Sequence, residues 1–222
     1  MHTRVHRSLL ADVEKRALIW IAARLPDRIH SDHLTALALL AMVLAGASFW
    51  LARVSPAGLW LVVICLAVNW FGDSLDGTLA RVRRQERPRY GFYVDHVIDI
   101  AGITALFGGL ALSSYMTPIV AACLLVAYLL VAAEVFLATA TSGTFTMSFL
   151  GIGPTELRII LAAGALTLLV QPTSVVFGRT YLLFDVGGVV AAVGLLVTFV
   201  VAAVRNTRLL ARAEPRAERG AR

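Results

Sequence analysis

The 222-residue sequence is short of charge, of lysine and of cysteine. Charged residues make up 15% of it, and hydrophobic residues make up 59% with a mean hydropathy of +0.79. A typical soluble domain is about 25% charged, so this balance excludes an ordinary soluble domain and predicts an integral membrane protein. Lys15 is the only lysine, and the net charge of +6 therefore comes almost entirely from arginine. In a membrane protein, such an excess of arginine reflects the orientation of the helices in the membrane and contact with anionic lipid headgroups rather than nucleic-acid binding.

The two cysteines, Cys65 and Cys123, both lie inside apolar runs. We expect them to pack as small apolar residues or to face lipid, and they predict neither a disulfide nor a metal-binding pair.

The N-terminal segment, residues 1–30, lacks the apolar core of a signal peptide, because charged residues stand where that core would be. Its apolar residues instead recur at helical spacing, with charged residues on the other side. The apolar set is Val5, Leu9, Val13, Ala17, Trp20 and Ile21, and the charged set is Arg4, Arg7, Asp12, Lys15 and Arg16. This pattern predicts an amphipathic helix on the membrane surface followed by a link, and a fully solvated helix is the alternative.

Six apolar segments follow and predict an all-α membrane domain of six transmembrane helices over residues 31–205. They cover approximately residues 34–54, 57–83, 90–112, 117–139, 155–170 and 181–204. Most supply the roughly 20 residues that cross a bilayer, although the fifth is short. Ser31 and Asp32 can cap the first of these helices. The polar residues 206–222 are expected to form a tail.

Arginine is distributed unevenly between the two sides that alternating helices would create. The N-terminal arm, the turn between the second and third segments and the C-terminal tail fall on one side and hold most of the basic residues, whereas the other side has only Arg53 and Arg179. By the positive-inside rule the basic side is cytoplasmic, with both termini on it. We therefore expect a protein of the bacterial inner (cytoplasmic) membrane.

Four aspartates lie between apolar runs: Asp73, Asp76, Asp95 and Asp99. The first pair is spaced i,i+3 and the second i,i+4, so each pair shares one helix face. Asp73 lies about 16 residues into its helix, or roughly 24 Å, which puts it near the cytoplasmic side. The second pair lies in the first turns of the returning helix. The two pairs should therefore meet at similar depth near the cytoplasmic face.

Unpaired carboxylates would cost roughly 2.5–3.5 kcal/mol each in mid-membrane. A divalent cation offsets such a cluster most directly, and all-oxygen ligands favour Mg²⁺, with Mn²⁺ or Ca²⁺ as alternatives. The competing interpretation is a set of structural salt bridges to Arg81, Arg83 or Arg84.

Small residues extend the first aspartate pair's helix face. Gly77 and Ala80 follow Asp73 at i+4 and i+7 and would open a groove beside the carboxylates, although close helix packing explains such residues equally well. Arg81 adds a cation at the mouth of the groove. Metal ions, an arginine and a small-residue groove suit a phosphate-bearing ligand.

The run from Asp73 to Arg81, DSLDGTLAR, and the run from Gly91 to Asp99, GFYVDHVID, resemble the signature of the CDP-alcohol phosphotransferase (CDP-alcohol phosphatidyltransferase) family, D-x2-D-G-x2-A-R followed by G-x3-D-x3-D. All eight residue types of the signature are present. The resemblance implies an N-terminal surface helix, six membrane helices and a homodimer. The spacer between the runs is slightly longer than usual. The family's first helix often opens with a proline and then has a threonine; the stretch from Ser31 to Thr35 has the threonine but lacks the proline.

The resemblance also implies a reaction, in which an alcohol attacks the β-phosphate of a CDP-linked donor and CMP leaves. Carried over, Asp73, Asp76 and Asp95 would hold two metal ions with help from Asp99, and Asp99 would be the general base. The residues that would frame the CDP group are Gly77, Ala80, Arg81 and Gly91.

His96 complicates the assignment of the base, because its pKa in water suits proton transfer near neutrality. It is either a second catalytic candidate or a residue turned towards headgroups or a neighbouring helix. The form Asp-His-x-x-Asp, and the stretch from Thr141 to Arg158, resemble the aminoalcohol (choline/ethanolamine) branch of the family. Two donors therefore stay open: CDP-diacylglycerol, with a polar alcohol as acceptor, and a CDP-aminoalcohol, with diacylglycerol as acceptor.

Other polar residues in apolar surroundings are weaker signals. Glu134 could bind an amine headgroup and Arg158 a phosphate on an acceptor, or the two could form a structural pair. For Asn69, a hydrogen bond to a neighbouring helix is a better interpretation than a ligand-binding role.

Two other classes of protein remain as alternatives. Aspartate-rich, Mg²⁺-dependent membrane prenyltransferases usually carry a further aspartate four residues after the second, where this chain has Ala80. A cation transporter would spread its charges through the depth of the membrane, whereas these cluster near one face.

Overall fold

The computed structural model describes residues 9–142 and 154–214, which form seven helices and one β-hairpin. The elements are α1 (Leu9–Ala22), α2 (Ser31–Leu51), α3 (Ala57–Val82), α4 (Pro88–Ala111), α5 (Pro118–Ser142), α6 (Pro154–Leu168), β1 (Thr173–Val176), β2 (Arg179–Leu182) and α7 (Leu183–Ala213).

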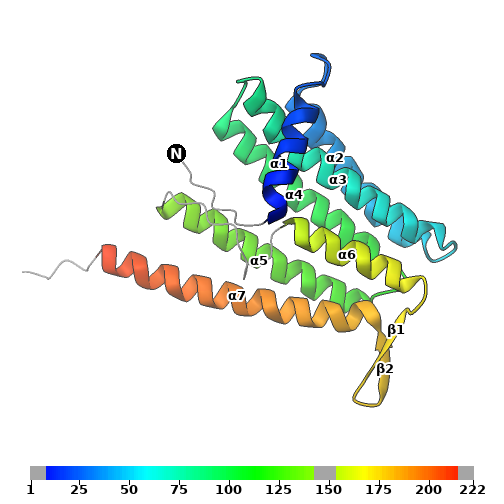
Figure 1. Ribbon diagram of the computed structural model, residues 1–222. Coiled ribbons are helices and arrows are strands. Elements are labelled where there is room, and N and C mark those ends of the chain that lie inside the picture. Colours follow the sequence, from blue (N-terminus) through cyan, green and yellow to red (C-terminus); the bar gives the residue numbers. More distant parts are fainter. Residues whose placement is uncertain (1–8, 143–153, 215–222) are drawn as a thin grey trace, which may run out of the picture.

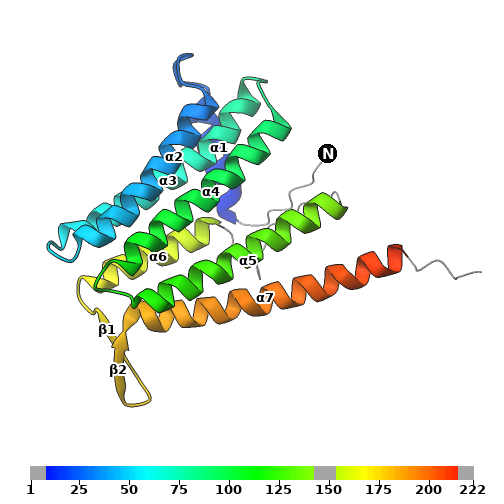
Figure 2. The same cartoon turned by 180° about the vertical axis from the view of Figure 1, so that it is seen from behind.

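Helix α2 is the centre of one group of helices, since both α3 and α4 pack along it (Figure 1). Helices α1 and α6 pack against α3, while α4 leads to a second group in which α5 packs on α7. The reverse view shows the same division, with α5 and α7 side by side and apart from α2 and α3 (Figure 2). The expected all-α architecture is therefore observed, apart from the hairpin.

Within the described residues, five helices are long and apolar enough to cross a membrane: α2, α3, α4, α5 and α7. The chain is an integral membrane protein by this measure. Helix α6 has 15 residues, or about 22 Å, which is less than the roughly 30 Å of a hydrocarbon core. The length of α6 therefore does not confirm the sixth predicted membrane crossing.

Glycine allows α2 and α4 to cross in close contact. A Cβ atom on Gly109 would lie 2.0 Å from the carbonyl oxygen of Gly46, and one on Gly46 would lie 2.3 Å from that of Ala105. Any larger residue at these positions would push the two backbones apart. Because α4 carries the second pair of aspartates, this crossing helps fix their position.

The start of α2 differs in detail from the expected Ser31–Asp32 cap. His30 is the N-cap residue, and its backbone N–H donates to Nδ1 of His33 at 3.1 Å. Ser31 is the first helical residue, and its hydroxyl is used elsewhere, as described below.

The hairpin before α7 was not predicted. The sixth apolar segment, predicted over residues 181–204, corresponds to α7, which begins at Leu183 and continues to Ala213, into the segment expected to be a tail. Strands β1 and β2 pair antiparallel, with Val176 opposite Arg179. Phe177 and Gly178 between them have φ values of +50° and +77°, as a tight two-residue hairpin turn requires. Most of the hairpin lies in the short gap between the fifth and sixth apolar segments, and only Tyr181 and Leu182 belong to the sixth.

Helix α1 packs on α3 through Leu18 and Ala22, which are buried with Leu75 and Leu79. Trp20 is exposed and carries the Arg24 guanidinium over its ring at 4.0 Å. A helix is present at the predicted place from Leu9, whereas Arg4, Val5 and Arg7 lie outside the described residues. Its amphipathic, surface-lying character stays a prediction.

Candidate active site

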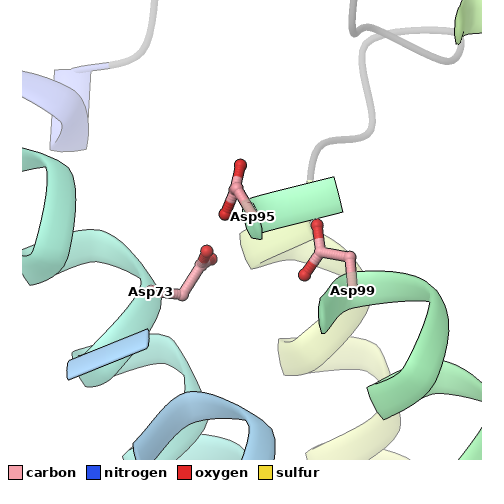
Figure 3. A group of neighbouring side chains, drawn as sticks. All are labelled: Asp73, Asp95 and Asp99. Carbon is pink, nitrogen blue, oxygen red and sulfur yellow. The ribbon is translucent and has the colours of Figure 1, made fainter. Parts of the chain in front are cut away.

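Three of the four aspartates converge. Asp73 comes from α3 and Asp95 and Asp99 from α4, and each offers a carboxylate oxygen within 4.8 Å of the others (Figure 3). All three are half-buried. The two helices run antiparallel and both pack on α2, which brings the end of α3 and the start of α4 together. The expected meeting of the aspartate pairs is therefore observed for these three.

Asp76 has a different setting from the converging group. Its Oδ2 accepts a hydrogen bond of 2.7 Å from the Thr35 hydroxyl on α2, and its Oδ1 accepts one from the backbone N–H of Gly77. Its carboxylate still interacts electrostatically with those of Asp73 and Asp95. Asp76 thus lies at the edge of the cluster, tied to a neighbouring helix.

Arg158 supplies the cation of the site. From α6, its Nη2 donates to Asp73 Oδ2 at 2.6 Å and its Nε donates to Asn69 Oδ1 at 2.7 Å. Asn69 in turn donates to the Ala38 carbonyl at 3.0 Å, which confirms its expected role between helices. This chain of bonds joins α2, α3 and α6 at the depth of the aspartates.

The arginines near the motif in the sequence have other partners. Arg81 donates to the Thr78 hydroxyl at 3.1 Å. Arg83 donates to three carbonyls of the link before α2: those of Leu25, Pro26 and Ile29. The salt-bridge interpretation therefore named the wrong arginines, because sequence proximity could not show that α6 lies beside α3.

The converging carboxylates fit a hard divalent cation. Two ligands on opposite sides of a Mg²⁺ ion are about 4.2 Å apart, close to the 4.8 Å limit that contains the three oxygens. Hard carboxylate oxygens are also the ligands that Mg²⁺ and Mn²⁺ prefer. The donor set thus suits the kind of ion expected from the sequence.

The residues expected around the CDP group border open space. A Cβ on Gly91 would meet no atom within 4 Å, and one on Gly77 would meet only the Arg81 guanidinium, at 3.4 Å. Ala80 lines a groove of about 520 Å³ between the end of α3 and the start of α2. The other residues of the groove are His30, Ser31, Asp32, His33, Leu79, Gln85, Glu86 and Arg87.

Arg87 forms an ion pair with Asp32 at 2.5 Å on the wall of this groove. The hydrogen bond from Arg87 to Asp32 raises the pKa of the guanidinium above its ordinary value. Arg87 therefore stays charged, and both residues of the pair line the groove.

His96 is packed against aromatic rings. Its ring lies between those of Phe92 and Phe136, with centroids 4.1 and 5.0 Å away, and its Nδ1 is 2.6 Å from the Phe92 carbonyl oxygen. It also lines a cavity of about 30 Å³ together with Asp99 and Tyr128. His96 is thus turned towards the neighbouring helix α5, while remaining close to Asp99.

Glu134 and Arg158 do not pair with each other. The Asn206 amide of α7 donates to Glu134 Oε1 at 2.6 Å, while Arg158 contacts Asp73. The side chain of Glu156, and most of the stretch from Thr141 to Arg158, lie outside the described residues.

Sequence reasoning missed two residues of the site, Thr35 and Tyr128. Thr35 carried a partial signal, since the family's first helix often has a threonine near its start. Nothing in the sequence distinguished Tyr128 from the other apolar residues of α5.

A helical fold with several apolar spans and three converging carboxylates suits a metal-dependent membrane enzyme. Residues 29–207 match the family model of CDP-alcohol phosphatidyltransferases, and the chain belongs to that family. It is a transferase of phospholipid synthesis that forms a phosphodiester. Members of the family use a divalent metal with a CDP-alcohol. This membership rules out the prenyltransferase and transporter interpretations.

A solved structure has a similar fold: Mycobacterium tuberculosis phosphatidylinositol phosphate synthase with CDP-DAG bound. The match has a TM-score of 0.55 and 22% sequence identity, and it covers 88% of this chain and 92% of that one. Among curated proteins, no sequence matches the chain.

Proposed function

We propose that this enzyme transfers a phosphatidyl group from CDP-diacylglycerol to the hydroxyl of a polar, phosphate-bearing alcohol, with release of CMP. The observation that carries the proposal is the convergence of Asp73, Asp95 and Asp99, contributed by the two runs of the family signature. The partly buried Arg158 beside them supports an anionic acceptor, because an arginine can bind a phosphate through two parallel hydrogen bonds.

The metal centre would use all four aspartates. Asp73, Asp95 and Asp99 form the converging group, and Asp76 would complete a two-ion site at its edge. Mg²⁺, or Mn²⁺ in its place, would polarise the pyrophosphate and offset the charge of the departing CMP when bound.

The CDP group would lie beside Gly77, Ala80, Arg81 and Gly91. The groove next to Ala80 and the open space at Gly91 support this placement, since both leave the backbone accessible to a flat ligand. Arg81 would contribute a positive charge to the diphosphate.

Asp99 would act as the general base on the acceptor hydroxyl. It belongs to the carboxylate group, whereas the His96 ring is held between two phenylalanines. The proton would move from the hydroxyl oxygen to a carboxylate oxygen of Asp99 as the new phosphodiester bond forms.

The second candidate is a CDP-aminoalcohol donor with diacylglycerol as acceptor. The Asp-His-x-x-Asp form around His96 favours it, and Glu134 offers a carboxylate for an amine. The first candidate is preferred because of Arg158, and because the similar solved structure, that of a phosphatidylinositol phosphate synthase, is described with CDP-DAG bound.

The protein would cross a bacterial inner membrane six times, with α1 on the surface and with both termini and the site on the cytoplasmic side. The Thr117 backbone N–H donates to Asp185 Oδ1 at 2.7 Å, so α5 and α7 begin at the same end of the molecule. Helix α6 would therefore return the chain across the membrane despite its length. By analogy with the family, the enzyme would be a homodimer.

Release of CMP tests the function directly. The purified enzyme would be incubated with radiolabelled CDP-diacylglycerol or CDP-ethanolamine, with Mg²⁺ or EDTA, and with glycerol 3-phosphate, inositol phosphate, serine or diacylglycerol. We expect Mg²⁺-dependent CMP from CDP-diacylglycerol and a phosphorylated alcohol. CMP from CDP-ethanolamine and diacylglycerol alone would favour the second candidate, and no CMP from any pair would refute both.

A further inference from the structure

Helix α2 approaches α3 closely at the level of the site. A Cβ atom on Gly72 would lie 2.7 Å from the Leu34 carbonyl oxygen and 3.1 Å from the Ala38 side chain. Glycine at this position therefore lets the short side chains of α2 reach α3 directly. One turn further along α3 is Asp76.

Two hydroxyls of α2 donate hydrogen bonds to Asp76, one to its side chain and one to its backbone. The Thr35 hydroxyl donates to the carboxylate at 2.7 Å, and the Ser31 hydroxyl donates to the Asp76 carbonyl at 2.8 Å. Thr35 is buried, with 8% of its surface exposed. Its single hydroxyl hydrogen also has the Ser31 carbonyl within reach at 3.1 Å, which is the longer contact.

The bond from Thr35 to Asp76 differs from that of Ser48, the other buried hydroxyl in α2. Ser48 donates to the carbonyl of Leu44, four residues earlier, and has no charged partner among its hydrogen bonds. This local bond satisfies a buried hydroxyl without another helix. Thr35 has the same local option and is nevertheless directed at a carboxylate of the signature.

We propose that Thr35 is a positioning residue that holds the Asp76 carboxylate in the orientation needed to bind a divalent cation. The proposal rests on the metal centre of the proposed function. Asp76 lies near the charges of Asp73 and Asp95, so repulsion would favour other side-chain orientations. A donated hydrogen bond from a stiff, β-branched residue opposes that repulsion and limits the orientations available.

Metal affinity tests this role separately from turnover. Thr35→Val removes the hydroxyl at nearly constant shape, Thr35→Ser keeps it, and Ser48→Ala removes a hydroxyl from the same helix at a distance from the site. Binding of Mn²⁺ to the purified, full-length enzyme would be measured by electron paramagnetic resonance without substrates, and the melting temperature of each metal-free variant would be recorded.

Loss of hydrogen bonds to metal-ligating groups typically lowers affinity about 10–100-fold, so Thr35→Val should bind Mn²⁺ at least about tenfold more weakly. Thr35→Ser and Ser48→Ala should bind like the wild type. If Thr35→Val does not fold, Thr35→Ala removes the same hydroxyl and should give the same loss of affinity.

Wild-type affinity in the folded Thr35→Val variant would overturn the positioning role and leave the proposed function intact. An equal loss in Ser48→Ala would also overturn it, because the effect would then follow general stability. A wild-type enzyme that binds no Mn²⁺ would overturn the metal centre itself, and with it the role of Thr35.

Discussion

Arg158 donates a hydrogen bond of 2.6 Å to Asp73, although 85 positions of the sequence separate them. The pair is largely shielded, with 13% of the arginine side chain and 25% of the aspartate side chain exposed. It joins α6 to the aspartate-bearing part of α3. The short helix α6 thereby contributes a residue to the candidate active site.

Replacing Arg158 by glutamine should destabilise the metal-free protein. The change leaves the Asp73 carboxylate with no cation in a shielded place, which we expect to cost about 2–3 kcal/mol. The melting temperature in detergent with EDTA should fall, and Mg²⁺ should restore part of the loss. Arg179→Gln on the exposed hairpin is the matched control. Equal melting temperatures for the two variants would contradict a stabilising role of the pair.

Asp99→Asn should reduce kcat by at least about 100-fold, because general-base catalysis typically contributes a factor of 10²–10⁴. His96→Ala should keep most of the turnover but lower the melting temperature, since it removes a ring packed between Phe92 and Phe136. Rates of CMP release at saturating Mg²⁺ would be compared. A larger kcat loss in His96→Ala than in Asp99→Asn would transfer the base to the histidine.

Asp76→Asn should abolish turnover with little change in melting temperature. The amide oxygen can still accept the Thr35 hydrogen bond, while the NH2 group removes only the acceptor for the adjacent Gly77 N–H. The side chain loses the charge that attracts a cation. Asp27→Asn is the control, because Asp27 is fully exposed and 4.0 Å from its arginine partner. Retained CMP release in Asp76→Asn would refute its assignment as a metal ligand.

Replacing each of two adjacent glycines of α4 by alanine should change the stability of the protein differently. Gly109→Ala would place a Cβ 2.0 Å from the Gly46 carbonyl oxygen, and the overpacking should cost about 1–3 kcal/mol. Gly108→Ala meets no atom within 4 Å and should leave stability unchanged or slightly raised. Thermal unfolding in detergent would compare them. Similar melting temperatures would contradict the close crossing of α2 and α4.

Cysteine labelling should show on which side of the membrane α5 begins and on which side α6 ends. In a Cys65→Ala, Cys123→Ala background, Ser114→Cys before α5 and Phe177→Cys in the hairpin should both react with a membrane-impermeant maleimide added to intact cells. Ala213→Cys, at the end of α7, should react only after permeabilisation. Because α5 leaves the Ser114 side, labelling of both positions requires α6 to cross back. Protection of Phe177→Cys alone would contradict six crossings.

The sequence by itself determined the membrane class, the approximate extents of six helices and the family. These properties depend on local patterns: apolar runs fix where helices lie in a bilayer, and the spacings of Asp73–Asp76 and Asp95–Asp99 fix a shared helix face. The interhelical role of Asn69 was also predictable, since a polar side chain among apolar helices requires a partner.

Only the tertiary structure decided how the carboxylates are divided. Asp73 joins Asp95 and Asp99, whereas Asp76 is held by Thr35, and the cation beside them comes from α6 rather than from the arginines of the motif. These outcomes depend on how closely the helices approach one another, which Gly72 and the Gly46–Gly109 crossing control. The periodicity of a single helix carries no information on that distance, so the partners of each charge emerged only when the helices were packed.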